Sequence, residues 1–161
     1  MDARLAAGEI AELLQPVLER EGFFRRGLNW YRYGTESILV IEVQPSDFLP
    51  GPYINLGIYY FRYGSAEFPD IVDCHLDTGF VSVIPNPLRG NALLDPNSAI
   101  SLDVRRQELD EQIHAHAIPW LQMMGNFSAA KLVIKENPFA AHIAAVAQSD
   151  LIPPAPLISE P

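Results

Sequence analysis

The sequence predicts an α+β fold: a mainly antiparallel four-stranded sheet with an N-terminal helix on one face, followed by C-terminal helices. Two observations support this prediction. The first segment repeats apolar residues at steps of three and four positions, which is typical of a helix with one buried side. Residues 28–84 then alternate between β-branched or aromatic runs and short turns, which favours strands that pair with their neighbours in the sequence.

The N-terminal helix is the clearest element of the sequence. It is expected to end at Gly22, because glycine readily adopts the backbone conformation that closes a helix. Its apolar residues form one stripe, which consists of Ala6, Ile10, Leu13, Leu14, Val17 and Leu18. We expect this stripe to cover the fully apolar face of the sheet, the one that carries Leu39, Ile41 and Val43.

Four strands are expected between this helix and residue 84. A turn at residues 34–36 and the Pro-Gly-Pro sequence at residues 50–52 separate the first three of them. Short connections of this kind favour antiparallel pairing of consecutive strands. The predicted strands span residues 28–33, 37–44, 53–61 and 73–84.

The second half of the chain is predicted to be mostly helical. Residues 85–98 are expected to form a loop, because they hold three prolines and a glycine. Pro119 is expected to bend or end the first helix that follows this loop. The expected helix starts lie near Asp103, Ser128 and Asn137.

The domain organisation is expected to be simple. A chain of 161 residues with 48% hydrophobic and 19% charged residues is long enough and apolar enough to form one globular core. We assign residues 1–148 to a single α+β domain and residues 149–161 to a proline-rich C-terminal tail. Prolines 153, 154 and 156 fix an extended backbone, so this tail is expected to lack regular secondary structure.

The chain is acidic, with 20 Asp and Glu residues against 11 Lys and Arg residues and a formal net charge of −9. A negative field repels nucleic acids and anionic membranes, so we expect neither as a partner, and it attracts basic proteins. No apolar run approaches the roughly 20 residues that span a membrane. Because Cys74 is the single cysteine, no intrachain disulfide is possible, and a cytoplasmic location is expected.

The sequence contains no recognisable catalytic motif. It has no glycine-rich phosphate loop, no paired-cysteine zinc spacing and no nucleophile elbow. The histidines at positions 75, 114, 116 and 142 are expected to point in different directions, which opposes a shared metal. We therefore predict no catalytic residue, no cofactor and no metal site, and we expect a protein that is not an enzyme.

One face of the predicted sheet is unusually polar. Alternation along residues 37–44 places Glu42 and Gln44 on the same side, and alternation along residues 53–61 places tyrosines beside Asn55 on the matching side. Gly57 leaves a gap there that another group could approach. Tyrosine mixed with neutral polar groups is typical of recognition surfaces. The candidate recognition surface consists of Glu42, Gln44, Tyr53, Asn55, Tyr59 and His75.

The alternative for this face is a structural one. The later helices would then cover it, and its polar groups would hydrogen-bond to one another. The sequence does not decide which sheet face is exposed.

Four short motifs carry a resemblance to a known family. They are the sequence GFFRRGLNWYR at residues 22–32, VQPS at residues 43–46, YINLG at residues 53–57 and Cys74-His75. In this order and spacing they resemble the bacterial family named domain of unknown function 4304, over about residues 5–84 and more loosely to about residue 125. The resemblance implies an α+β fold and a bacterial, cytoplasmic setting. It implies no established reaction and no catalytic residue.

Three functions are compatible with these observations. The leading hypothesis is a non-enzymatic protein-binding domain, and its specific form is an immunity-type inhibitor of a basic toxin. The second is a small-ligand binder or enzyme that uses the polar face around Gln44 and Asn55. The third is a structural subunit that associates with copies of itself.

Overall fold

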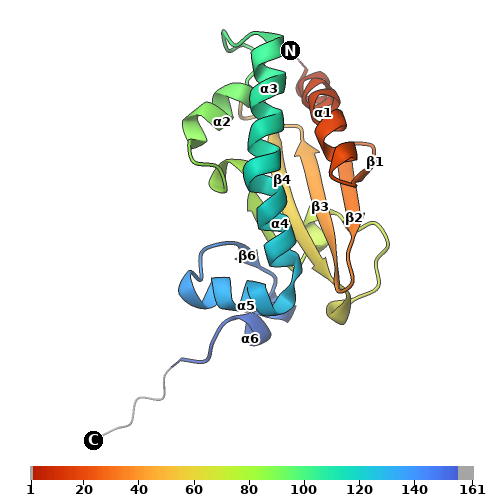
Figure 1. The fold of residues 1–161 in the computed structure, drawn as a ribbon, viewed down its shortest axis with the longest axis vertical. Coiled ribbons are helices and arrows are strands. Elements are labelled where there is room, and N and C mark those ends of the chain that lie inside the picture. The colour runs from red at the N-terminus through yellow and green to blue at the C-terminus, as the bar shows by residue number, and fades with distance from the viewer. Residues whose placement is uncertain (1, 156–161) are drawn as a thin grey trace, which may run out of the picture.

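A computed structural model describes residues 2–155 of the chain. In this range the chain forms an α+β fold with an N-terminal helix, a six-stranded sheet and helices in the C-terminal half (Figure 1). All neighbouring strands are antiparallel, and their order in the sheet is their order in the sequence. The strands are β1 (Phe24–Arg26), β2 (Asn29–Tyr33), β3 (Ser37–Gln44), β4 (Tyr53–Tyr60), β5 (Leu76–Gly79) and β6 (His142–Ile143).

The prediction of four strands was wrong, because two short edge strands extend the sheet. β1 pairs with β2 through a tight hairpin in which Gly27 has a φ of 63°, a conformation that favours glycine. β6 places Ile143 opposite Leu76. A partner so distant in sequence leaves no local pattern, which is why β6 was missed.

The predicted fourth strand, residues 73–84, is much shorter in the structure. Only Leu76–Gly79 pairs as β5. Single 3-10 turns flank it, η2 (Ile71–Asp73) before it and η3 (Phe80–Ser82) after it. A further 3-10 turn, η1 (Phe61–Tyr63), follows β4 directly.

The helices cover one face of the sheet, and Figure 1 shows α1, α3 and α4 in front of the strands. A π-helical turn at Ile113–Ala117 joins α3 to α4, so the chain stays helical from Leu102 to Gly125. The helices are α1 (Ala3–Arg20), α2 (Pro87–Leu94), α3 (Leu102–Gln112), α4 (Ile118–Gly125), α5 (Phe127–Glu136) and α6 (Ala145–Leu151).

Several predictions for the second half need correction. The predicted loop at residues 85–98 contains α2, because the Asn86 side chain accepts a hydrogen bond from the Arg89 N–H (3.0 Å) and caps the helix. Pro119 does not end the long helix. The π-helical turn precedes it, and such turns accommodate a break in the regular hydrogen-bond ladder. Asn137 does not start a helix, because residues 137–144 lead into and form β6.

The boundary expected between residues 148 and 149 falls within α6, which continues to Leu151. The predicted tail therefore begins with three helical residues. Residues 156–161 lie outside the described range.

The main hydrophobic core lies between the sheet and the helices. The stripe of α1 is buried as predicted, and Leu14 and Leu18 are fully buried. The strands contribute alternate residues to the same core: Trp30, Leu39, Ile41, Val43, Ile54, Leu56, Ile58, Tyr60 and Leu76. The prediction of which face of β3 and β4 packs against the first helix is confirmed.

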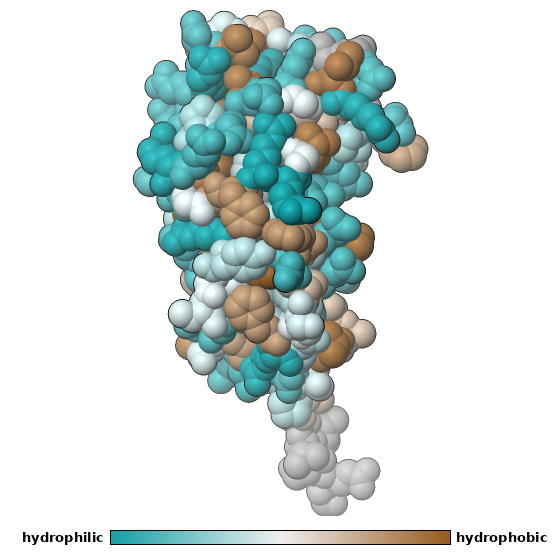
Figure 2. Space-filling view, turned by 90° about the vertical axis from the view of Figure 1, so that its right-hand side faces the viewer, coloured by the Kyte–Doolittle hydropathy of each residue, from teal (hydrophilic) through white to brown (hydrophobic). Residues whose placement is uncertain are grey.

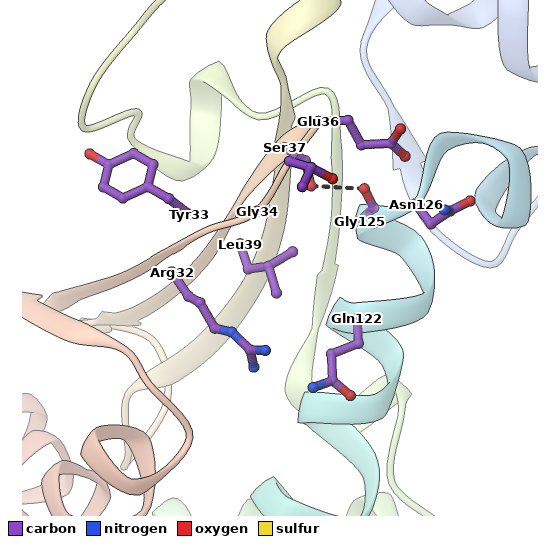
Figure 3. A pocket seen from close by; sticks show the side chains of 10 residues that line it. Arg32, Tyr33, Gly34, Glu36, Ser37, Leu39, Gln122, Gly125 and Asn126 are labelled. Carbon is purple, nitrogen blue, oxygen red and sulfur yellow. Dashed lines mark hydrogen bonds between the residues drawn. The ribbon is translucent and has the colours of Figure 1, made fainter.

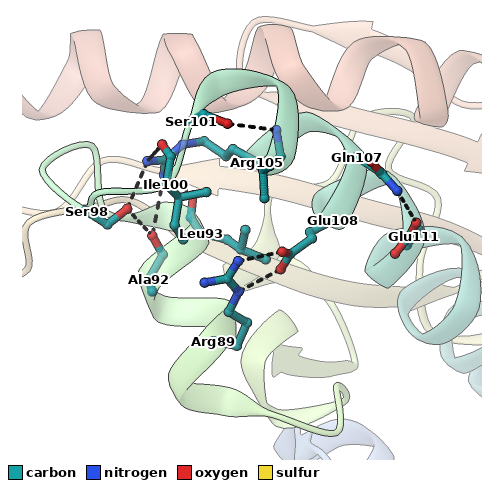
Figure 4. A network of polar contacts seen from close by, with 11 residues as sticks. Arg89, Ala92, Leu93, Ser98, Ile100, Ser101, Arg105, Gln107, Glu108 and Glu111 are labelled. Carbon is teal, nitrogen blue, oxygen red and sulfur yellow. Dashed lines mark hydrogen bonds and ion pairs between the residues drawn. The ribbon is translucent and has the colours of Figure 1, made fainter.

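Arg105 anchors the connection between α2 and α3 (Figure 4). Its guanidinium is buried and donates hydrogen bonds to the carbonyl oxygens of Leu93 and Asp95, the latter at 3.0 Å. It also donates to Ser98 Oγ at 2.9 Å. A buried cation satisfied by backbone carbonyls holds this loop against the core. Next to it, Arg89 forms a two-pronged ion pair with Glu108.

The surface of the molecule is mixed in character. On the flank shown in Figure 2, hydrophobic residues form small groups separated by hydrophilic ones. Phe48 and Phe139 are each 93% exposed, but they lie in separate loops. Within residues 2–155, no helix combines the length and the apolar character that a membrane crossing requires.

Candidate functional site

The polar face of the sheet is the side opposite the helices. The strand register places Asn29, Glu42 and Asn55 in one row across β2, β3 and β4. Gln44 and Tyr53 are opposite each other in an adjacent row. Because directly paired residues project to the same side of an antiparallel sheet, these five side chains form one polar surface. The sequence-based grouping of Glu42, Gln44, Tyr53 and Asn55 therefore agrees with the observed register.

Asn55 links its two polar neighbours on β3. Its Nδ2 donates to Glu42 Oε2 at 2.9 Å and to Gln44 Oε1 at 2.8 Å. These bonds use the amide hydrogens of Asn55 within the surface. The second Glu42 oxygen and the Asn55 carbonyl oxygen keep lone pairs for a partner.

Asn29 has a similar role on β2. Its Nδ2 donates to the hydroxyl of Tyr31 and to Asp70 Oδ1, each at 3.3 Å. Asp70 belongs to the connection between β4 and β5, so this bond ties the connection to the sheet. As at Asn55, the amide donors of this side chain are used within the protein.

The gap above Gly57 is filled by the protein itself. A Cβ at position 57 would lie 2.7 Å from Cys74 Sγ and 2.8 Å from Ile71 Cδ1. A small hydrophobic cluster forms at this point, made of Tyr31, Ile38, Val40, Tyr59 and Cys74, with Ile71 packed against it. The β4–β5 connection thus covers part of the polar face, and the later helices lie on the other side of the sheet.

Four carboxylates gather around Cys74. Glu42 comes from β3, Asp70 and Asp73 from the connection that includes η2, and Asp77 from β5. Burial and then the charges of all four carboxylates raise the pKa of the Cys74 thiol. We call these four residues the acidic face.

Few ion pairs neutralise the negative charges of the acidic face. Asp77 pairs with His142, at 2.9 Å between Oδ2 and Nδ1. Glu42, Asp70 and Asp73 take part in none of the ion pairs found among residues 2–155. In the same part of the chain, no group of three or more His, Cys, Asp or Glu side chains is placed to hold a metal ion.

Two of the predicted surface residues are not on the surface. Tyr59 is only 7% exposed and His75 only 5%. Their rings lie 4.6 Å apart, and the Tyr59 hydroxyl accepts a hydrogen bond from the Ala66 N–H at 3.1 Å. Both side chains are therefore structural. Of the other predicted residues, Gln44 and Tyr53 are exposed, and Glu42 and Asn55 are half-buried.

His75 has a defined structural task. Its Nδ1 accepts a hydrogen bond from the backbone N–H of Tyr60 at 2.9 Å. Burial lowers the pKa of His75, so the imidazole is neutral near neutral pH and has an acceptor for this bond. Cys74 points to the cluster above Gly57, whereas His75 packs against Tyr59, Tyr60 and Tyr63.

A second site was not anticipated from the sequence. A pocket of about 220 Å³ lies between the β2–β3 hairpin and the C-terminal end of α4 (Figure 3). Arg32 and Gln122 point into it from opposite sides, and Leu39 lies between them. The only local signal is that Arg32 occupies the same side of β2 as the buried Trp30, where an apolar residue is expected.

The fold and the polar surface define a small α+β domain with an acidic sheet face. The chain belongs to the family described as domain of unknown function (DUF4304), whose family model matches residues 14–123. The match runs from within α1 into α4 and includes the first five strands. Searches of curated proteins and of solved structures found no match to the chain.

Proposed function

We propose that this chain is a non-enzymatic protein-binding domain that recognises a basic partner through its acidic face. The observation that carries the proposal is the convergence of Glu42, Asp70, Asp73 and Asp77 around Cys74 from three separate segments. Such a field speeds the approach of a positively charged protein and disfavours acidic ones.

The hydrogen bonding of the surrounding surface supports the same partner. The side-chain donors of Asn29 and Asn55 are used within the protein, which leaves carboxylate and carbonyl oxygens for a ligand. Lys and Arg side chains supply only donors and carry the complementary positive charge. Tyr53, 41% exposed at the edge of this surface, adds an aromatic group of the kind enriched in interfaces.

The proposal has a specific form, an immunity-type inhibitor that masks the active surface of a basic toxin inside a bacterial cell. The net charge of −9 and the single cysteine support this form. An inhibitor of this type needs a rigid surface. The antiparallel ladder and the cluster above Gly57 provide one.

The test is an affinity capture from the organism that encodes the chain, with three proteins as bait. The first is the wild type. The second carries Glu42→Gln and Asp70→Asn, which remove two charges from the acidic face. The matched control carries Glu9→Gln and Glu136→Gln, two exposed carboxylates on helices α1 and α5.

The expected result is one basic protein retained by the wild type and by the control and lost from the acidic-face variant. Its binding should weaken steeply with salt, since the attraction is screened over about 10 Å at 0.1 M ionic strength. Equal retention by both variants would show that the acidic face is not the binding surface. If the wild-type bait retains no basic protein, the proposal is wrong.

A further inference from the structure

We infer that the pocket between the β2–β3 hairpin and α4 binds a small carboxylic acid, with Arg32 and Gln122 as its polar contacts. This site lies on the helix side of the sheet, away from the acidic face, and does not depend on the proposed function. Its walls come from parts of the chain that are about 90 residues apart, so only the folded protein contains it.

The far end of the pocket is built by a close approach of α4 to β3. Ser37 Oγ donates a hydrogen bond to the Gly125 carbonyl oxygen at 2.8 Å. A Cβ at position 125 would lie 2.6 Å from Leu39 Cδ2 and 3.1 Å from Ser37 Oγ, so a larger residue there would have to displace these side chains. The contact fixes the distance between the hairpin and the helix and therefore the width of the pocket.

Arg32 supplies a positive charge that no ion pair among residues 2–155 neutralises. Its Nη1 donates to the Glu21 carbonyl oxygen at 3.2 Å, which holds the side chain in place. A guanidinium has five N–H donors, and one edge of two parallel donors matches a carboxylate. In Figure 3 the guanidinium end of Arg32 points across the pocket toward the Gln122 amide.

The neighbouring acidic groups are already occupied. The Glu36 carboxylate accepts a hydrogen bond from the Phe127 N–H at the start of α5, and the Glu21 carboxylate pairs with His114. Glu36 also lines the pocket, and both carboxylates keep their negative charge, so a ligand with a single negative charge is favoured over a dianion. A phosphate dianion would meet more repulsion from these carboxylates than a carboxylate monoanion would.

The size of the pocket limits the rest of the ligand. About 220 Å³ is below the range of roughly 300–1,000 Å³ that holds drug-sized ligands. Leu39, 6% exposed, forms an apolar floor between the two polar groups. A short aliphatic acid would place its carboxylate between Arg32 and Gln122 and its alkyl group on Leu39.

The experiment is a titration of the whole 161-residue chain with isobutyrate, followed by ¹H–¹⁵N NMR. Isobutyramide, which has the same shape without the charge, and inorganic phosphate are the comparison probes. Saturable shifts at the β2–β3 hairpin and the end of α4 are expected with isobutyrate alone. Shifts of equal size with isobutyramide, or binding of phosphate in place of isobutyrate, would overturn the assignment.

Three variants locate the site. Arg32→Gln should weaken isobutyrate binding at least tenfold, and Gln122→Leu should weaken it several-fold. Arg62→Gln is the matched control, because the Arg62 guanidinium lies over the Phe127 ring, 3.8 Å from its centre, and does not line the pocket. If Arg62→Gln weakens binding as much as Arg32→Gln, the effect is general electrostatics and the site is wrong. Gln122 is exposed, so Gln122→Leu is expected to fold and keeps the test valid if Arg32→Gln unfolds. If Gln122→Leu binds isobutyrate as tightly as the wild type does, the inference is also contradicted.

Discussion

The sulfur atom of Cys74 occupies the space above Gly57 in which any other residue would place its Cβ. The two positions belong to different segments, β4 and the connection that leads into β5, and their contact brings the connection onto the sheet. A Cβ at residue 57 would be 2.7 Å from the sulfur, closer than such atoms approach in proteins.

Gly57→Ala is therefore expected to destabilise the protein by about 1–3 kcal/mol through overpacking. Chemical denaturation measures the change. Combining it with Cys74→Ala should cost less than the sum of the two single changes, because the smaller residue leaves room. Gly8→Ala is the control: a Cβ there meets nothing within 4 Å in the middle of α1, and alanine should stabilise this helix by roughly 0.5–1 kcal/mol. Strict additivity of the two changes would contradict the contact.

Cys74 is expected to be unreactive in the folded protein. Burial and the four surrounding carboxylates raise the pKa of its thiol, so the thiolate that reacts is scarce at neutral pH. A thiol reagent such as DTNB should label the native protein only as fast as it unfolds, and should label the denatured protein at once. Complete labelling of native protein within seconds would be incompatible with the buried position.

His75→Leu should destabilise the fold by roughly 1–3 kcal/mol, because it leaves the Tyr60 N–H without an acceptor in a buried position. His75→Asn is the informative comparison, since its side-chain oxygen lies close to the position of Nδ1 and does not titrate. Its stability at neutral pH should lie between that of the wild type and that of His75→Leu. Thermal unfolding of all three proteins at pH 7.5 gives the ranking.

The wild type and His75→Asn together also test how the stability of the fold depends on pH. The folded-state pKa of His75 is lowered, so the unfolded chain binds the proton more readily. The stabilisation by neutral His75 is fully present above the unfolded pKa of about 6.5 and falls as the pH drops below it toward the folded pKa. Between pH 7.5 and 5.5 the wild type should lose stability relative to His75→Asn. A constant difference would mean that His75 does not titrate differently on folding.

Arg105→Met is expected to cost about 3 kcal/mol or more, because it leaves several carbonyl oxygens of the α2–α3 connection unsatisfied. Arg105→Lys should also destabilise the protein, since a single ammonium group cannot donate to all the partners that the planar guanidinium reaches. The neighbouring Arg106 is exposed, and Arg106→Met should change stability by less than about 0.5 kcal/mol. Urea denaturation measures the free energy of unfolding of the three variants. If Arg105→Lys is as stable as the wild type, a planar guanidinium is not needed at this position.

Leu14→Ala tests the packing of α1 on the sheet. Leu14 is fully buried, so its truncation should cost about 2–5 kcal/mol. Leu5 is 65% exposed on the same helix, and Leu5→Ala should have an effect below about 0.5 kcal/mol. Similar losses for the two variants would indicate that the helix does not pack as described.

The long central elements could be predicted because they have strong local patterns. The period of α1 and the alternation along β3 and β4 assigned the buried side of each, and the bounds of β3 were predicted without error. The edge strands and α2 could not be predicted in this way. β1 and β6 are only two or three residues long, and α2 begins at a proline in a segment rich in turn residues.

The candidate site was predictable to a similar extent. Alternation grouped Glu42, Gln44, Tyr53 and Asn55, and the register agrees with that grouping. The burial of Tyr59 and His75 depends on the β4–β5 connection, whose path the sequence does not reveal. The approach of Asp70 and Asp73 to Glu42 depends on the same path.

By itself the sequence determined the composition of this protein, its negative charge, its family and the inner faces of its main helix and strands. These properties are local, since a periodic pattern in a few residues fixes which side is apolar. Tertiary structure alone decided which sheet face stays partly open, where the four carboxylates meet and how Arg32 comes to face Gln122. Each of these depends on contacts between distant segments, and such contacts form only when the burial of the whole core outweighs the entropy lost in closing the loops between them.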